Sequence, residues 1–331
     1  MHRRTLSFLI LPLLSCLTAC GGDPGGSVYT SGTDDEIDGS DSSDGGSSSS
    51  TSTTTDTTGT SEDSSDSSDG GIKLDVFLSD LGGGGNPIIP MTCAQAEAGE
   101  STIGCLFYAV DLDQAGIFEN GQFGVAISNI QSQQSATVIV ERKVNNIWSQ
   151  AAPAQIIDPM SLYVFPLPDQ HQSGSGVKHG GAYRITSDVP IIAYQFNPFE
   201  KGAWSTDASL LYPVPAWDTL NHVISWPDGS GRGYFTIVGQ VDGTVVEVTP
   251  SVATAAGPGV AAGSPGVPFS INLEEGDIAE VMVAADNMDL TGTRVSSDDP
   301  VAVFTAHECA YIPDLMNACD HLEEQIAGLH L

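Results

Sequence analysis

The sequence predicts an all-β protein built of two tandem β-sandwich-like modules, because one segment occurs twice and short strand patterns surround both copies. Tyr183–Tyr194 (YRITSDVPIIAY) aligns with Thr293–Phe304 (TRVSSDDPVAVF), 110 residues further on, with Arg, Ser, Asp and Pro in register. Two weaker segment pairs follow at about that offset: 123–127 with 235–239, and 136–140 with 244–248. Repetition at a fixed offset indicates a duplicated structural unit.

Both predicted modules contain short β-branched or aromatic runs that are bounded by Gly, Pro, Asn and Asp, as strands are. The runs of the first module are 122–127, 136–141, 161–166, 182–186 and 190–196. Those of the second are 234–238, 243–249, 269–273, 278–284, 292–296 and 300–305. Helix patterns are scarce, so each module is expected to resemble a β-sandwich.

Turn chemistry predicts how some of these strands connect. Val241-Asp242-Gly243-Thr244 predicts a hairpin with a type I′ turn, since Asp-Gly tolerates the positive φ angles of that turn. Asp188-Val189-Pro190 and Asp298-Asp299-Pro300 predict one further turn, repeated in both modules. The stretch 255–268, rich in Gly, Ala and Pro, predicts a surface loop.

The N-terminus predicts export. The basic residues His2-Arg3-Arg4 precede an apolar run, Leu6–Leu14, that is too short to span a bilayer. Leu17-Thr18-Ala19-Cys20 then resembles the lipobox of bacterial lipoproteins, which implies a signal peptide at 1–19 and a lipid on Cys20. The alternative is an ordinary secretory signal. We expect a chain that is lipid-anchored to the cell envelope, and Gly21 after the Cys favours the outer membrane or cell surface.

Residues 20–71 predict a disordered tether, because they are nearly all Gly, Ser, Thr and Asp. Such a segment buries too little apolar surface to offset the entropy of ordering it. Its acidic groups repel one another and extend the chain. Calcium binding by the Asp-Ser-Ser-Asp-Gly runs is the alternative, but the regular ligand ladder of a calcium loop is missing.

The rest of the chain divides into a lead-in segment with a local disulfide at 72–110, module 1 at 111–215, module 2 at 216–326 and an end at 327–331. Of the 42 acidic and 10 basic residues, 30 acids and 8 bases fall after the tether. This charge leaves no basic face, so we expect no nucleic-acid partner.

Four cysteines remain after the signal peptide and Cys20: Cys93, Cys105, Cys309 and Cys319. Outside the cytosol, their proximity in sequence favours the disulfides Cys93–Cys105 and Cys309–Cys319. Three connectivities are possible in principle, and a four-Cys zinc site is the alternative. That alternative lacks the Cys-x-x-Cys spacing typical of zinc sites.

Several blocks resemble the N-terminal domain family of the IgG Fc-binding protein. They are Gln195–Pro198, Ser205–Pro215, Asp289–Thr293, His307–Cys309 and Cys319–Gln325. The resemblance runs from about residue 105 to 326 and implies an extracellular, β-rich, non-enzymatic interaction domain. It does not carry Fc binding to this chain. In the family the last block leads into further β-repeats, so the end of this sequence resembles the opening of a third module.

The densest polar cluster of the sequence is a candidate metal site. His307, Glu308, Asp320 and His321 flank the predicted disulfide Cys309–Cys319, and these side chains suit Zn²⁺ or another divalent ion. The alternative is that they form hydrogen bonds around the disulfide loop. Asp111-x-Asp113 is a second candidate, either for calcium or as an ordinary strand-end loop.

Four aromatic residues gather between the modules: Trp204, Tyr212, Trp217 and Trp226. They are candidates for a platform that binds glycans, and packing in the core or at the junction is the alternative.

The sequence therefore predicts a non-catalytic cell-surface lipoprotein for adhesion or ligand binding. Its expected partners are an extracellular protein or glycan, and the membrane through the lipid on Cys20. No nucleophile or phosphate-loop motif is present, and no cofactor is expected. The alternatives are an extracellular metal-dependent hydrolase with its site at the His307–His321 loop, and a structural module of the envelope.

Overall fold

The computed structural model describes residues 89–99, 101–116, 119, 121–199, 206–313 and 318–329. The predicted signal peptide, Cys20 and the tether lie outside these residues. The first half contains α1 (Cys93–Glu97), β1 (Gly104–Val110), β2 (Gly124–Asn129), β3 (Ala136–Val144), β4 (Ile147–Gln150), β5 (Gln155–Ile157), β6 (Ser161–Pro166), β7 (Gly176–Lys178), β8 (Ala182–Asn197) and β9 (Asp207–Leu210). The second half contains the short 3₁₀ helix Val214–Ala216, β10 (Asp218–His222), β11 (Gly233–Gly239), β12 (Thr244–Thr249), β13 (Phe269–Leu273), β14 (Ile278–Met282), β15 (Arg294–Ala310) and β16 (Asp320–Gln325).

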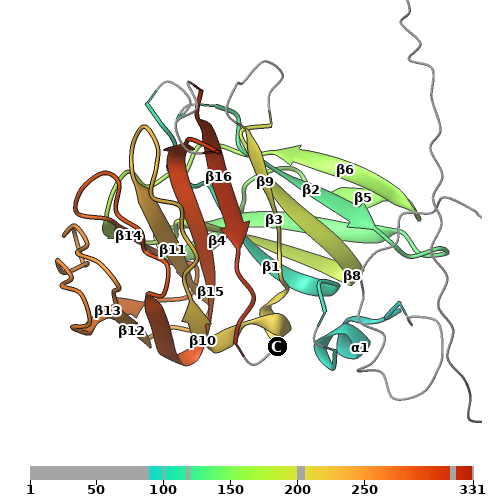
Figure 1. Cartoon of the computed structure of the whole chain (residues 1–331). Coiled ribbons are helices and arrows are strands. Elements are labelled where there is room, and N and C mark those ends of the chain that lie inside the picture. Colours follow the sequence, from blue (N-terminus) through green and yellow to red (C-terminus); the bar gives the residue numbers. More distant parts are fainter. Residues whose placement is uncertain are drawn as a thin grey trace, which may run out of the picture. The chain divides into compact units, whose positions relative to one another are not determined.

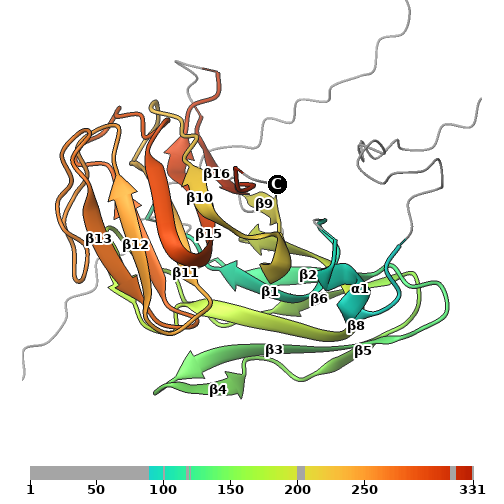
Figure 2. The ribbon, with the colours of Figure 1, turned by 90° about the horizontal axis from the view of Figure 1, so that it is seen from below.

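The strands form two antiparallel sheets, as the all-β prediction requires (Figures 1 and 2). The first follows the order β4-β3-β8-β2-β6, and β1, β5 and β9 also pair with its strands. The second follows β13-β12-β15-β11-β14-β7, and β10 and β16 pair with β15. In each sheet, one long strand, β8 or β15, is the common partner around which the others are arranged.

The predicted duplication is confirmed strand by strand. β1, β2, β3 and β9 pair with β8 as β10, β11, β12 and β16 pair with β15. The register corrects one part of the alignment: Val125 faces Gln195 as Phe235 faces Thr305, so Phe235 corresponds to Val125. Phe123 lies just before β2 and is two residues out of register. The shift keeps the same sheet face, which explains why the apolar pattern allowed it.

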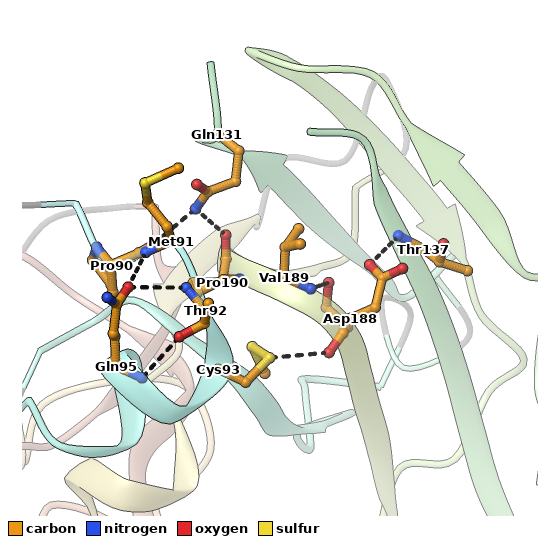
Figure 3. Close-up of a disulfide and its surroundings, with 12 residues drawn as sticks. Pro90, Met91, Thr92, Cys93, Gln95, Gln131, Thr137, Asp188, Val189 and Pro190 are labelled. Carbon is orange, nitrogen blue, oxygen red and sulfur yellow. Dashed lines mark hydrogen bonds between the residues drawn. A yellow bond between two sulfur atoms is a disulfide. The ribbon is translucent and has the colours of Figure 1, made fainter. Parts of the chain in front are cut away.

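The Asp-x-Pro motifs are corners inside β8 and β15 and not the predicted turns between separate strands. Opposite β1, the register jumps from Thr186 to Ile191 across a bulge, and β15 jumps in the same way from Ser296 to Val301. Pro190 lacks a main-chain N–H and suits this gap in the ladder. The Asp188 carboxylate accepts a hydrogen bond from Thr137 N at 2.7 Å (Figure 3). Asp298 accepts one from Val245 N at 2.8 Å.

The predicted hairpin at Asp242-Gly243 is also wrong, because β11 and β12 do not pair with each other. Both pair with β15, on its opposite sides. Gly243 has φ +84°, but Asp242 does not have the positive φ that a type I′ turn needs. The Asp242 carboxylate instead accepts a hydrogen bond from Glu275 N at 2.9 Å. This bond links the connection between β11 and β12 to the connection between β13 and β14.

The two faces of the second sheet pack against two different hydrophobic clusters. Side chains alternate along β11: Tyr234 and Val238 face a cluster shared with the first half, whereas Phe235 and Ile237 face a cluster formed mainly within the second half. β14 and β15 alternate in the same way. This sheet is thus buried on both faces, which is why β11 reads as a continuous apolar run.

Strand pairing crosses the predicted division into segments. β1 lies in the lead-in 72–110, yet it pairs with β8 as β10 pairs with β15. β7 lies in the range of module 1 but pairs with β14 of the second half. Val177 of β7 packs against the second-half cluster. The repeat is therefore clear in the sheets, although the first half contributes β7 to the sheet of the second half.

Both predicted disulfides, Cys93–Cys105 and Cys309–Cys319, are present. The first fastens α1 to β1. Thr92 and Gln95 form a capping box that starts this short helix, with Gln95 N donating to Thr92 Oγ1 at 3.3 Å. Figure 3 shows α1 beside the corner of β8.

Candidate functional site

A pocket of about 310 Å³ lies between the end of β15, the edge strand β16 and the segment after β10. It is lined by Asp207, Ile224, Ser225, Trp226, Thr305, Ala306, His307, Ile312, Leu322, Glu323 and Glu324. The register places His307 opposite Leu322 and Thr305 opposite Glu324, so these side chains share one face of the sheet. The volume is in the range of small-ligand sites.

The outer part of the pocket is apolar and acidic. Ile224 is 69% exposed and Ile312 is 52% exposed. Trp226 is half-buried, and its indole Nε1–H donates to Tyr311 O at 3.0 Å, which fixes the ring. Asp207 and Glu324 add carboxyl groups, and the lining contains no Lys or Arg. Such a surface suits a ligand that offers apolar groups together with hydroxyl or cationic groups.

His307 forms the buried part of the pocket. Its ring is 1% exposed, and Nδ1 accepts a hydrogen bond from Cys309 N at 3.0 Å. Gly229 leaves room for the ring, because a Cβ there would lie 2.2 Å from His307 Cε1. Burial, with a further effect of His321, lowers the pKa of His307 to about 4. His307 is therefore neutral at neutral pH.

His321 and Glu323 lie on the other face of β16, turned into the protein. Their side chains are fully buried, and His321 Nε2 lies 3.5 Å from Glu323 Oε2. Burial lowers the pKa of His321 to about 4 and raises the pKa of Glu323 well above its usual value. Both directions favour a neutral imidazole beside a protonated carboxyl.

β9 and β16 are held together next to the pocket by side chains that bind main-chain groups. Glu323 N donates to Asp207 Oδ2 at 2.8 Å, and Gln325 N donates to Ser209 Oγ at 2.7 Å. In the other direction, Tyr212 N donates to Gln325 Oε1 at 2.8 Å. These bonds give two main-chain N–H groups at the open edge of β16 a partner, and they join the two sheets. Figure 1 shows β9 beside β16.

The four predicted metal ligands are not brought into one coordination set. Successive residues of β15 point to opposite faces, so His307 and Glu308 diverge, and Glu308 Oε2 accepts from Arg232 N. Asp320 is exposed at the start of β16, while His321 is buried. Within the described ranges, the group of three such donor atoms within 4.8 Å of one another is Asp111, Asp169 and His171.

That second group combines one half of the Asp111-x-Asp113 pair with two residues that the sequence did not suggest. Asp169 Oδ1 lies 2.6 Å from His171 Nδ1, and Asp111 Oδ2 accepts from Gln170 N at 2.7 Å. Burial raises the pKa of Asp111 to about 7. Lys178 Nζ donates to His171 O at 2.8 Å, so a cationic side chain already lies close to the loop.

Asp113 turns away from this group toward Gly174 N, from which it accepts at 3.1 Å. Burial raises the pKa of Asp113 to about 7. Asp111 and Asp113 thus accept hydrogen bonds from different positions of the same loop, Gln170 N and Gly174 N. Asp169 lies 58 residues and His171 lies 60 residues after Asp111 in the sequence, so the group becomes visible only where the two segments approach each other in the structure.

The aromatic candidates that the structure describes do not form one platform. Trp204 lies outside the described residues. Trp217 is 7% exposed and packs on Tyr108, with 5.5 Å between ring centroids. Tyr212 is half-buried against the shared cluster, and its carbonyl accepts from Trp217 Nε1 at 3.0 Å. Of the three described, Trp226 is the one that lines the pocket.

Comparison with known proteins gives a family-model match over part of the chain. The family model described as IgGFc binding protein matches residues 207–330. The match starts at β9 and covers the second half with its pocket, whereas the resemblance expected from about residue 105 extends beyond it. No curated protein and no solved structure matches the chain. Among the described residues, no helix is long and apolar enough to cross a membrane.

Proposed function

We propose that this chain is an exported lipoprotein that is anchored to the outer membrane or cell surface through Cys20. Its β-rich body binds an extracellular protein or glycan and does not catalyse a reaction. The lipobox-like residues and the acidic tether of the sequence support the anchoring. The match to the IgGFc binding protein model supports a binding-type domain.

The pocket beside β16 is the observation that carries the binding proposal. Its exposed Ile224 and half-buried Trp226 offer apolar contact area, while Asp207 and Glu324 offer hydrogen-bond acceptors. Rigid aromatic rings next to acceptor groups are typical of surfaces that bind sugars or protein segments. The buried His307 is neutral and packed under Gly229, so it shapes the pocket floor.

Binding is tested with the immobilised full-length chain, using a glycan array, purified immunoglobulin and an envelope extract as probes. We expect saturable binding to one probe. Ile224→Ser should weaken this binding at least 10-fold, because it removes exposed apolar area without touching the core. Ile147→Ser is the matched control, since Ile147 is 66% exposed on β4 and lies outside the pocket lining.

Equal binding by Ile224→Ser and Ile147→Ser would contradict the assignment of this pocket. The metal content is measured on the same preparation. Stoichiometric zinc without any binding partner would instead favour the metal-dependent hydrolase.

The anchoring is tested separately by metabolic labelling with palmitate. We expect label in the wild-type chain and in Cys16→Ala, but none in Cys20→Ala. Label that persists in Cys20→Ala would contradict the lipid attachment at this cysteine.

A further inference from the structure

The pocket beside β16 carries negative charge that no described Lys or Arg balances. Asp207 and Glu324 contribute carboxyl groups to its lining, and no basic side chain is among the described residues that line it. The ion pairs that described Lys and Arg side chains form go to carboxylates outside this lining, namely Asp242, Glu141, Glu275 and Asp286. The two carboxyl groups of the pocket are therefore open to a cation from another molecule.

The contact between β9 and β16 keeps these two carboxyl groups near each other. Asp207 Oδ2 accepts from Glu323 N at 2.8 Å, and Asp207 Oδ1 accepts from Ala208 N at 2.8 Å, which fixes the carboxylate beside β16. Glu324 lies opposite Thr305, on the pocket face of β16. Partial desolvation, with a further effect of the Asp207 charge, raises the pKa of Glu324. A cation bound by both groups would offset this repulsion and form charge-assisted hydrogen bonds.

The apolar part of the pocket suits the hydrocarbon stem of a long cationic side chain. Ile224 and Ile312 are exposed, and Trp226 is half-buried with its indole N–H already bonded to Tyr311 O. Lys and Arg pack their stems on such a surface while the charged head stays in polar surroundings, and an indole face attracts cations. Burial lowers the pKa of His307 to about 4, so the ring at the pocket floor is neutral and does not repel a cation.

The chain itself contains a filled example of this combination of groups. The Arg184 guanidinium lies over the Trp148 ring, with 4.1 Å between its central carbon and the ring centroid. Arg184 donates to Glu141 Oε2 at 2.9 Å and to Glu275 Oε1 at 3.0 Å. An indole beside two carboxylates therefore holds a guanidinium in this protein. The pocket beside β16 offers the same groups, an indole and two carboxylates, and no cation from the described part of the chain lines it.

We propose that this pocket receives an Arg or Lys side chain of a basic extracellular protein, bound by Asp207 and Glu324 and packed on Trp226. The inference rests on the proposed binding function, because it names the partner group that enters the same pocket. The chain after the tether has 30 acidic and 8 basic residues, and this excess attracts basic proteins over long range. A neutral glycan would cover the two carboxyl groups without supplying a counter-charge, which costs solvation energy.

Titration of the full-length chain with short peptides tests the proposal, with the indole N–H signal of Trp226 in the NMR spectrum as the readout. Trp226→Phe identifies this signal. The probe is the blocked peptide Gly-Leu-Arg-Leu-Gly, and the matched peptides carry Lys or the neutral Arg analogue citrulline at the centre. We expect a saturable shift with the Arg and Lys peptides, at affinities at least about 10-fold higher than with citrulline. Raising NaCl from about 50 to about 500 mM should weaken the binding, because salt screens exposed charges.

Variants of the carboxyl groups locate the effect. Glu324→Gln should lower the affinity for the Arg peptide about 10-fold and leave that for the citrulline peptide unchanged, because only the first carries charge. Asp207→Asn should act in the same direction, and urea unfolding checks that its contact with β16 survives. Glu247→Gln is the matched control, since Glu247 is exposed on β12 and lies outside the pocket lining.

Three results would overturn the cationic partner: no Trp226 shift with the Arg peptide, equal binding of the Arg and citrulline peptides, or full binding by Glu324→Gln. The proposed binding function fails separately. If Ile224→Ser still weakens the binding of a neutral glycan from the array, the pocket is a binding site and only its cationic partner is wrong. If Ile224→Ser changes the binding of no probe, the assignment of the pocket itself is wrong.

Discussion

At the scale of single residues, burial decides what His307 does. A buried imidazole that accepts a hydrogen bond through Nδ1 is neutral, because charging it would cost the solvation that water provides in the unfolded chain. His307 stands in a conspicuous His-Glu-Cys sequence, which suggested metal chemistry. Its surroundings make it part of the packing beneath the pocket.

The shifted pKa of His307 predicts a pH-dependent effect on stability. The folded pKa is about 4, below the ordinary value of the unfolded chain, so the unfolded state takes up a proton first. The stability that His307 contributes is then present above about pH 6.5 and is lost toward pH 4, by at most about 1.4 kcal/mol per pH unit.

Urea unfolding of the wild-type chain and of His307→Gln between pH 4 and 8 checks this prediction. The advantage of the wild type over the variant should shrink as the pH falls through this window. His222→Gln, at an exposed position on β10, serves as the control for replacing a histidine by glutamine. A constant difference for His307→Gln would contradict a neutral buried imidazole.

At the scale of elements, the same bulged corner occurs in β8 and in β15. Asp188 and Asp298 occupy the same place in β8 and β15, and each accepts a main-chain N–H from the neighbouring strand, β3 or β12. The bulge lets one strand pair with two sets of partners. A turn motif in a sequence is therefore compatible with an uninterrupted strand when a side chain replaces the missing ladder contacts.

The equivalence of the two corners makes a quantitative prediction. Asp188→Ala and Asp298→Ala should each lower the free energy of unfolding by about 1 kcal/mol, since each removes one partly exposed hydrogen bond to a carboxylate. Asp158→Ala, at another exposed acidic position near the start of β6, is the control and should have little effect. Urea titrations of the three variants measure this, and a marked inequality between the two corners would argue against their equivalence.

The disulfides act on two different elements. Cys93–Cys105 closes a loop with a sequence separation of 12, and Cys309–Cys319 closes one of 10. The chain-entropy model assigns similar stabilisation to both, about 3 kcal/mol each. Replacing either pair by serine should therefore lower the free energy of unfolding by comparable amounts, as measured by urea unfolding without reductant. Little change for the Cys93/Cys105 pair alone would show that α1 is not coupled to global unfolding.

At the scale of the whole molecule, the sequence predicted the all-β class, the duplication and both disulfides, because these depend on local residue patterns and on separation along the chain. The spans of β6 and β13 were predicted to the residue. Local residue patterns did not predict which strands pair with each other. The hairpin between β11 and β12 failed because turn residues do not reveal that β15 lies between the two strands.

The candidate pocket was predictable only in part. His307 and Trp226 were both singled out, but for different sites, and the sequence does not show that they share one pocket. Asp207, Glu323 and Glu324 became relevant through the contact between β9 and β16, two edge strands more than 100 residues apart. Such pairs follow from sheet topology and leave no local signal in a single sequence.

The shared hydrophobic cluster predicts that the two halves unfold together. Phe304 is fully buried in this cluster, where side chains of β11, β14 and β15 meet those of the first sheet. Phe304→Ala should lower the free energy of unfolding by about 3–5 kcal/mol, through lost apolar contacts and a cavity. Because the cluster belongs to both halves, hydrogen exchange of β3 and of β12 should report the same loss.

Val246→Ala is the contrasting variant, since Val246 lies in the second-half cluster on β12. In a single cooperative unit, it too should lower the protection of slowly exchanging amides in both halves by one common amount. If Phe304→Ala or Val246→Ala instead weakened protection in β12 and left β3 unchanged, the halves would be separate folding units. The pairing of β7 with β14 would then be a contact between domains and not part of one core.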